Sequence, residues 1–183
     1  MATMHFDFTQ GATRGDIERQ LRERLGDETW ESLQQQAKAA GVPDGHHHGI
    51  AEVNATIDAL EVPQDVREDM HGVYAILAQA EAQVHGCAVD HTHFHEVGEG
   101  ARIRNTLLIC LAMRACKAER ITATPVQTGS GQIECAHGLM DIPAPATAAI
   151  LSTGIPVCAD KLEGELCTPT SAAIIKYYVE EYA

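Results

Sequence analysis

Apolar residues recur every three or four positions along most of the chain, which is the spacing of amphipathic helices. The first such stretch follows the glycine-rich turn at residues 11–16, where Asp16 is expected to cap a helix carrying Ile17, Leu21 and Leu25 on one face. Glycines and prolines separate this stretch from the later ones. The pattern predicts further helices over Asp27–Ala40, Ile50–Leu60, Pro63–Gly86, Ile103–Ala118, Pro145–Leu151 and Pro169–Tyr182.

Short apolar runs between these helices predict strands at residues 4–8, Ile121–Thr128, Gln132–Cys135 and Ile155–Cys158. Strands separated by helices are typical of an α/β or a mixed α+β domain. The 183 residues contain no repeat and no low-complexity linker. We therefore expect a single domain over residues 1–183, with short strands and about six helices.

Charge and composition exclude some classes of function. The formal net charge of −13 argues against nucleic acid as the main partner and favours cations. No apolar run approaches the roughly 20 residues that cross a bilayer, and no secretory signal opens the chain, so we expect a cytoplasmic protein. The six cysteines form no CxxC pair, which predicts reduced and mostly buried thiols.

The ten histidines are clustered, and the densest cluster is His91, His93 and His95 followed by Glu96. In an extended segment, alternate residues point to the same side, so the three imidazoles would share one face and Glu96 would lie on the other. Three such nitrogen donors can bind Zn²⁺, Ni²⁺ or Co²⁺. The alternative is a polar loop whose histidines hydrogen-bond to the backbone.

Two further clusters add possible metal ligands. His46, His47 and His48 lie between glycines, which predicts either a flexible loop that captures metal transiently or a solvated loop without that role. Cys135 and His137 lie near the end of a predicted strand, where a thiolate and an imidazole would favour nickel or zinc. Cys135 could equally be an inert core residue.

Anion-binding features occur at three predicted helix starts. The glycines of residues 11–15 could cradle a phosphate, and so could the start of the last helix, where Thr168 is a natural N-cap before Pro169. The second feature is equally explained as a well-made helix start. Arg102 and Arg104 lie near the start of the Ile103–Ala118 helix, where positive charge is unfavourable. We expect a compensating anion there, either a nearby glutamate (Glu96 or Glu99) or a bound phosphate or carboxylate.

Several motifs together resemble one family, the LarC-type nickel insertion proteins. The motifs occur in the order typical of that family, and the opening Phe6-Asp7 through Gly15-Asp16 is similar to its FDxxxGxxxGD start. The other matching stretches are Leu77-Ala-Gln-Ala-Glu-Ala-Gln-Val-His-Gly86, Thr92-His-Phe-His-Glu-Val-Gly98, Gly129-Ser-Gly131, Cys135-Ala-His-Gly138, Ile142-Pro-Ala-Pro-Ala-Thr147 and Gly164-Glu-Leu-Cys-Thr-Pro-Thr170.

The resemblance implies a nickel chelatase of the lyase class. Members of the family insert nickel into pyridinium-3,5-bisthiocarboxylic acid mononucleotide and so make the nickel-pincer cofactor of lactate racemase and related isomerases, with CTP and a divalent ion such as Mg²⁺ or Mn²⁺. By this resemblance the histidines and Cys135 would hold nickel, and Glu96 or His95 would take the ring proton. We further expect contacts with the anionic cofactor from Asp7, Gly11, Gly15, Asp16, Thr168 and Thr170. Arg102 and Arg104 are also candidates for this contact, although they stand where the family usually has an acidic stretch.

The family's C-terminal region, which is associated with the nucleotide, has no counterpart after the last helix. This leaves three alternatives beside the complete chelatase. The chain could be a subunit that works with a C-terminal partner chain, a non-catalytic carrier of nickel or cofactor, or a divergent cofactor-modifying enzyme on the same fold. A client isomerase and a homo-oligomer are the other partners that we consider.

Overall fold

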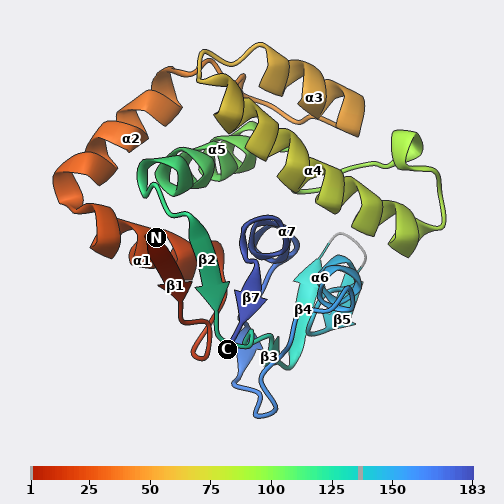
Figure 1. The fold of residues 1–183 in the computed structure, drawn as a ribbon. Coiled ribbons are helices and arrows are strands. Elements are labelled where there is room, and N and C mark those ends of the chain that lie inside the picture. Colours follow the sequence, from red (N-terminus) through yellow and green to blue (C-terminus); the bar gives the residue numbers. More distant parts are fainter. Residues whose placement is uncertain (1, 136–137) are drawn as a thin grey trace. The chain divides into compact units, whose positions relative to one another are not determined.

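The structure is a computed structural model that describes residues 2–135 and 138–183 (Figure 1). The chain divides into two compact units, residues 20–117 and residues 1–19 with 118–183, and the boundary lies within one helix. The described residues combine seven α-helices with short strands, which confirms the α/β class. The single domain over residues 1–183 stays a prediction. In the described part of the chain, every helix is too short or too polar to span a bilayer.

Residues 20–117 form a helical unit. Helix α4 contacts α3 and α5, and α2 packs on α5. A short 3-10 helix, η1, follows α4 and contacts its end. As the apolar sequence predicts, α5 is buried on most sides, including the whole run 106–113. The helices are α2 (Asp27–Ala39), α3 (Ile50–Asp58), α4 (Gln64–His85), η1 (Val89–His91) and α5 (Gly100–Ala115).

An ion pair between a buried aspartate and a partly exposed arginine joins α4 to α5. The carboxylate of Asp69 on α4 is 1% exposed, and it accepts two hydrogen bonds from the guanidinium of Arg114 on α5, at 2.5 and 2.6 Å. Two parallel N–H···O bonds set both the distance and the orientation of the partners. The pair therefore holds the first part of α4 against α5, and the histidine-rich segment begins where α4 ends.

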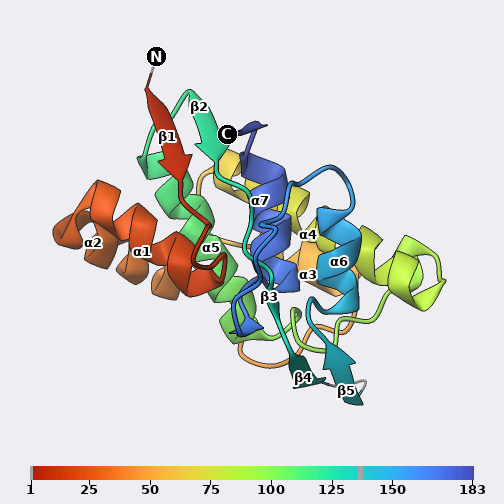
Figure 2. The same ribbon diagram turned by 90° about the horizontal axis from the view of Figure 1, so that it is seen from below.

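The other unit contains a parallel sheet with the strand order β1-β2-β7 (Figure 2). Met4 pairs with Ile121 and Phe6 with Ala123, and these four residues are buried while their neighbours along the strands are more exposed. Helix α6 packs on α7. Two antiparallel pairs, β3 with β6 and β4 with β5, complete the unit. Its elements are β1 (Thr3–Phe6), β2 (Arg120–Ala123), β3 (Gly129–Ser130), β4 (Gln132–Cys135), β5 (Gly138–Asp141), α6 (Pro145–Leu151), β6 (Gly164–Glu165), α7 (Pro169–Tyr178) and β7 (Glu181–Tyr182).

Helix α1 (Arg14–Leu25) crosses the boundary between the units, and its start corrects one prediction. The helix is capped by Thr13 and not by Asp16. The Thr13 hydroxyl accepts a hydrogen bond from the Asp16 amide at 3.3 Å, and the Asp16 carboxylate accepts one from the Thr13 amide at 2.9 Å. This reciprocal arrangement has the form of a capping box, in which Asp16 is the third helical residue.

The predicted strand over Ile155–Cys158 is wrong. Only Val157 pairs there, in an isolated bridge with Val126. Pro156 has no N–H to donate, which removes one bond from any longer ladder. The strand predicted from Ile121 also ends early, at Ala123, and the last helix ends at Tyr178 so that the chain can add β7 to the sheet.

Candidate functional site

The histidine tract (His46–His48) and the histidine loop (residues 91–96) lie side by side in the helical unit. The His47 amide donates to the Gly98 carbonyl and the Phe94 amide to the His48 carbonyl, both at 2.8 Å. His46 forms an antiparallel bridge with Glu99. Two clusters that lie about 50 residues apart along the chain therefore meet through backbone hydrogen bonds.

This pairing requires glycine at two positions. A Cβ atom on Gly98 would lie 1.9 Å from the carbonyl oxygen of His47, and one on Gly100 would lie 2.2 Å from that of Pro43. Any side chain at either position would force the two backbone segments apart. The glycines after the histidine loop thus allow the histidine tract to approach it.

The rings of the histidine tract also contact the neighbouring segment. The Nε2 atom of His46 donates to the Phe94 carbonyl at 2.6 Å, and the Nδ1 atom of His47 donates to the Gly98 carbonyl at 3.0 Å. In the neutral rings these bonds leave the lone pair on Nδ1 of His46 and on Nε2 of His47. Metal-binding histidines commonly donate their other nitrogen in this way. The tract is therefore held by hydrogen bonds and is not the flexible loop that its glycines predict.

The histidine loop keeps part of the predicted alternation. His91, His93 and His95 are exposed, whereas Thr92 and Phe94 between them are buried. The segment is not extended throughout, because His91 ends η1. The alternation stops after His95, so Glu96 is exposed as well and does not lie on an opposite, buried face. Among residues 2–135 and 138–183, no three histidine, cysteine, aspartate or glutamate side chains are arranged to hold a metal ion.

His85 lies beside this loop and was not among the residues expected from the sequence. His85 is the last residue of α4, and its ring centroid is 5.9 Å from that of His95. Its Nε2 atom lies 3.4 Å from a carboxylate oxygen of Glu81, one helical turn earlier. The signal that could have indicated His85 is its place directly before Gly86, the residue that ends α4 in a left-handed conformation.

The two arginines after the histidine loop are paired with carboxylates of the protein. Arg102 lies 3.3 Å from Glu96 and 3.5 Å from Glu99, and Arg104 donates to Asp44 at 2.8 Å. Helix α5 begins at Gly100, three residues before the predicted start, so Arg102 lies within its first turn. The two glutamates that we expected as compensating anions lie beside Arg102, whereas the partner of Arg104 is Asp44. Glu96, the candidate proton acceptor, therefore carries an arginine partner.

The candidate anion-binding residues belong to the other unit, where two helix starts lie close together. The Ala12 amide donates to the Leu166 carbonyl at 2.6 Å, and Ala12 pairs with Cys167. At α7, Thr168 caps the helix as predicted: its hydroxyl accepts from the Ser171 amide, and the Ser171 hydroxyl accepts from the Thr168 amide. Backbone amides at these helix starts thus already donate to acceptors within the protein. Thr170 lies in the first turn of α7.

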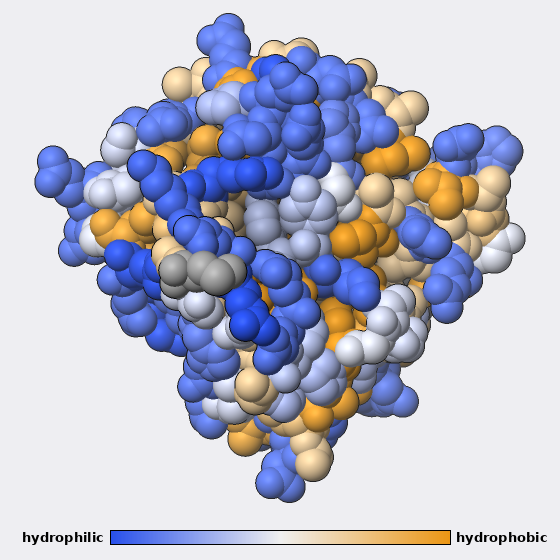
Figure 3. All heavy atoms as spheres, viewed as in Figure 1, coloured by the Kyte–Doolittle hydropathy of each residue, from blue (hydrophilic) through white to orange (hydrophobic). Residues whose placement is uncertain are grey.

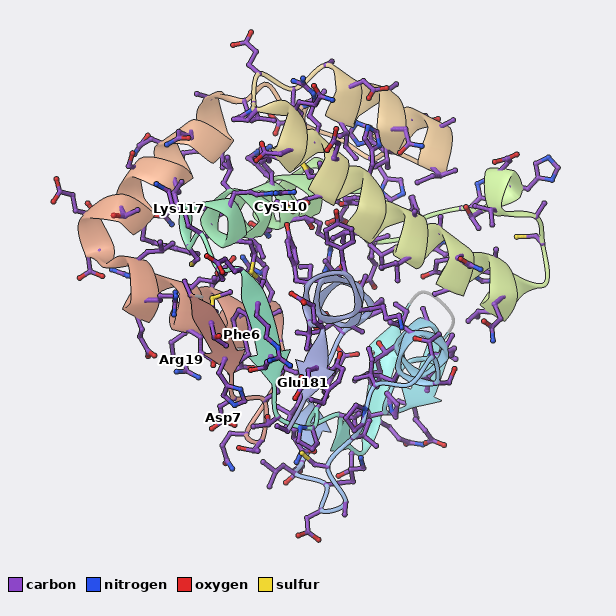
Figure 4. The ribbon with its side chains drawn as sticks, viewed as in Figure 1. Phe6, Asp7, Arg19, Cys110, Lys117 and Glu181 are labelled. Atoms are coloured by element: carbon purple, nitrogen blue, oxygen red, sulfur yellow. The ribbon has the colours of Figure 1, made fainter. Side chains whose placement is uncertain are left out.

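Asp7 follows β1 and is engaged locally. Its carboxylate accepts hydrogen bonds from the Thr9 hydroxyl at 2.6 Å and the Thr9 amide at 2.9 Å, and these bonds lower the pKa of Asp7. Figure 4 shows Asp7 next to Phe6, with Arg19 of α1 nearby, whose charge lowers this pKa slightly further. Gly11 is packed against Asp16, since a Cβ atom on it would lie 2.7 Å from a carboxylate oxygen, whereas one on Gly15 would make an ordinary contact with Thr13 at 3.7 Å.

The buried side-chain amide of Gln127 links residues 127–129 to the loop at residues 160–162 of this unit, and it was not singled out from the sequence. It is 2% exposed. Its side chain donates to the Asp160 carbonyl at 2.9 Å and accepts from the Gly129 amide at 3.0 Å. Nothing in the sequence around Gln127 distinguishes it from a surface glutamine. Its partners are all backbone groups, and those of Asp160 and Leu162 lie more than 30 residues away along the chain.

The six cysteines, all among the described residues, form no disulfide bond, as predicted, but only Cys110 and Cys167 are buried. Burial raises the pKa of the Cys167 thiol to about 12, so Cys167 is a core residue. Cys135, the candidate ligand, is half-buried at the end of β4, and its thiol lies 3.4 Å from the Gly138 carbonyl. His137, the other candidate of this hairpin, lies outside the described residues.

The comparison with known families decides the relationship of the chain. The family model described as "nickel insertion protein" matches residues 11–183. The chain belongs to the nickel insertion protein family. This membership confirms the resemblance that the sequence motifs indicated.

The curated relatives that the chain matches are considerably longer than this chain. The pyridinium-3,5-bisthiocarboxylic acid mononucleotide nickel insertion protein of Desulfitobacterium hafniense is 37% identical over 76% of this chain but only 35% of its own length. The protein of the same name from Staphylococcus saprophyticus is 40% identical over 72% and 33%, respectively. A putative nickel insertion protein of Roseiflexus castenholzii is 42% identical over 73% and 34%. The chain thus spans about a third of the length of these relatives, and no solved structure matches it.

Proposed function

We propose that this chain takes part in inserting nickel into pyridinium-3,5-bisthiocarboxylic acid mononucleotide, the substrate in the names of its relatives. The observation that carries this proposal is the convergence of the histidine tract and the histidine loop in one unit. Imidazoles bind nickel well, and the net charge of −13 attracts cations. Family membership and the donor chemistry therefore support the same substrate.

In this proposal the nickel ion and the mononucleotide are both substrates. A carbon–hydrogen bond of the pyridinium ring breaks, its electron pair forms the nickel–carbon bond, and the two thiocarboxylates supply the nickel–sulfur bonds. The ring hydrogen leaves as a proton, for which Glu96 or His95 is the acceptor. Arg102 would position the Glu96 side chain, since its guanidinium lies 3.3 Å from a carboxylate oxygen of Glu96.

Histidine donors would hold the ion before transfer, and His91, His93, His95 and the histidine tract are the candidates in the helical unit. Cys135 and His137 are candidates in the other unit. Arg102 and Arg104 are the candidate partners of the substrate's phosphate and thiocarboxylates. The helix starts with Gly11, Gly15, Asp16, Thr168 and Thr170, together with Asp7, remain the alternative phosphate contacts.

The test is a direct assay of the product. The chain is incubated with Ni²⁺ and the bisthiocarboxylate mononucleotide, with and without CTP and Mg²⁺ or Mn²⁺, and the small molecule is examined by mass spectrometry. We expect the mass of the nickel adduct, formed more slowly by the H93A/H95A double variant. His5→Ala is the matched control, because His5 is exposed on β1 and its Nδ1 atom lies 2.8 Å from the Thr122 hydroxyl. Failure to form the adduct under all of these conditions would contradict an insertion activity of this chain.

A second candidate is a carrier of nickel, and one observation favours it. The described residues contain no closed three-ligand group, so the ion would be held loosely and released readily. A carrier would bind Ni²⁺ and raise the yield of adduct when a full-length relative is added, without forming adduct alone. The same mass measurement separates the two candidates.

A further inference from the structure

A pair of histidines from two different elements lies at the edge of the histidine loop. His85 ends α4, and His95 follows ten residues later, after η1. Their ring centroids are 5.9 Å apart, with an angle of 60° between the ring planes. One ion with metal–nitrogen bonds of about 2.1 Å could join the two rings after small side-chain rotations.

The backbone on both sides of the pair is fixed. Gly86 is left-handed at φ 62 and reverses the chain directly after His85. On the other side, Phe94 is buried, packs edge-on against Tyr74 at 6.1 Å, and donates its amide to His48. The position of both histidines therefore follows from buried neighbours and backbone bonds.

The two histidines are accessible, and a carboxylate lies next to one of them. The side chain of His85 is 32% exposed, and His95 is exposed. Glu81 is more buried, at 16%, and its carboxylate oxygen lies 3.4 Å from Nε2 of His85. A carboxylate at this position favours the tautomer with hydrogen on Nε2 and the lone pair on Nδ1, as in carboxylate–histidine–metal sites. The surface around the end of α4 and η1 mixes hydrophilic and apolar residues (Figure 3). Val84 and Val89 of these elements are exposed.

We propose that His85 and His95 bind one divalent transition-metal ion together, with Glu81 as a positioning residue for His85. This inference deepens the proposed function and rests on it for the choice of nickel. Two protein ligands leave coordination positions open, and the thiocarboxylates of the substrate could fill them. Such a site differs from a structural zinc site, which closes around the ion with four protein ligands.

The test is a calorimetric titration of the full chain with Ni²⁺ alone, and with Mg²⁺ as a hard-cation control. We expect H85A and H95A each to lower the nickel affinity at least tenfold, and E81Q to lower it severalfold. The H85A/H95A double variant should bind little more weakly than either single variant, because residues that share one ion are not additive. Mg²⁺ should bind no differently in any variant.

His71→Ala is the matched control. His71 also lies on α4, but its ring nitrogens contact Asn54 at 3.0 Å and Asp58 at 2.8 Å, away from the loop. Unchanged nickel affinity in H85A, or an equal loss in H71A, would overturn the site. H85Q and the melting temperature of each variant show whether an effect arises from misfolding. The titration contains no mononucleotide, so the two proposals can fail separately. Unchanged nickel affinity in H85A, with adduct formed by the unchanged chain, would refute this inference alone. Reduced nickel affinity in H85A, without adduct formed by the unchanged chain, would refute only the proposed function.

Discussion

The substitution Gly98→Ala tests the pairing of the histidine tract with the histidine loop. The new Cβ atom would lie 1.9 Å from the His47 carbonyl oxygen, 3.0 Å from its carbon and 3.2 Å from Cβ of Phe94. Two of these three contacts are with backbone atoms, which cannot rotate away as the end of a side chain can. The backbone of Gly98 itself suits alanine, since its φ lies outside the left-handed region. The two segments must therefore move apart.

The cost follows from the bonds that this movement breaks. The Gly98 carbonyl accepts from the His47 amide at 2.8 Å and from the His47 ring at 3.0 Å. Each hydrogen bond contributes about 0.5–1.5 kcal/mol net. The smaller entropy of the unfolded alanine chain offsets about 0.4–1 kcal/mol of this loss. We expect the free energy of unfolding to fall by roughly 1–2 kcal/mol.

Two measurements check this prediction. Urea unfolding followed by circular dichroism gives the free energy, and amide hydrogen exchange at His47 gives the local effect. Gly49→Ala is the matched control in the same region, because its Cβ atom would make only an ordinary contact at 3.6 Å with the Thr92 carbonyl. Gly49→Ala should lower the free energy of unfolding by less than about 1 kcal/mol, because glycine is a better N-cap than alanine while alanine reduces the entropy of the unfolded chain. Retained protection of the His47 amide in G98A, with a stability equal to that of G49A, would refute the pairing.

Three further predictions concern the other unit. Thr168→Ala removes the capping box of α7 and should lower the free energy of unfolding by about 1 kcal/mol, against a smaller change for Thr170→Ala in urea titrations. Cys167, whose thiol has its pKa raised to about 12 by burial, should be alkylated at pH 8 only in urea; rapid labelling of the native chain, seen by mass spectrometry, would contradict this. The hydrogen bonds from Thr9 lower the pKa of Asp7, so its contribution is present above the pKa of the unfolded chain and is lost as the pH falls through the folded value. Urea midpoints at pH 7 and pH 3 should therefore differ less in Asp7→Asn than in the unchanged chain, and an equal difference would show that Asp7 contributes nothing.

Helices with strong periodicity and clear end signals could be predicted from the sequence. The helix predicted over Asp27–Ala40 is α2, which ends at Ala39, and the helix predicted to end near Gly86 is α4. Both properties are local, because the apolar spacing and the glycine that permits a left-handed end lie within the segment itself. The cap at Thr168 was predictable for the same reason.

Elements that depend on distant partners could not be predicted in this way. The two-residue strand β7 has no periodicity of its own and exists because β2 offers it hydrogen bonds. The cap of α1 was misassigned because Thr13 and Asp16 are both good capping residues, and only the geometry shows which one precedes the helix. The meeting of the histidine tract and loop depends on contacts about 50 residues apart along the chain.

Two pairs of histidines in the helical unit differ in their contacts, and this difference bears on the proposed function. His46 and His47 each give one ring nitrogen to a backbone carbonyl, so their rings help to hold the loop in place. His85 and His95 face each other at the accessible edge of the same loop. An ion that is to leave for a carbon and two sulfur ligands needs partners that hold it in a defined place but do not enclose it. In the proposed function, the first group would supply the defined place, and the second would supply donors that a sulfur-rich substrate can replace. Nickel affinity and loop stability should therefore respond to different substitutions, which the H85A and G98A variants measure separately.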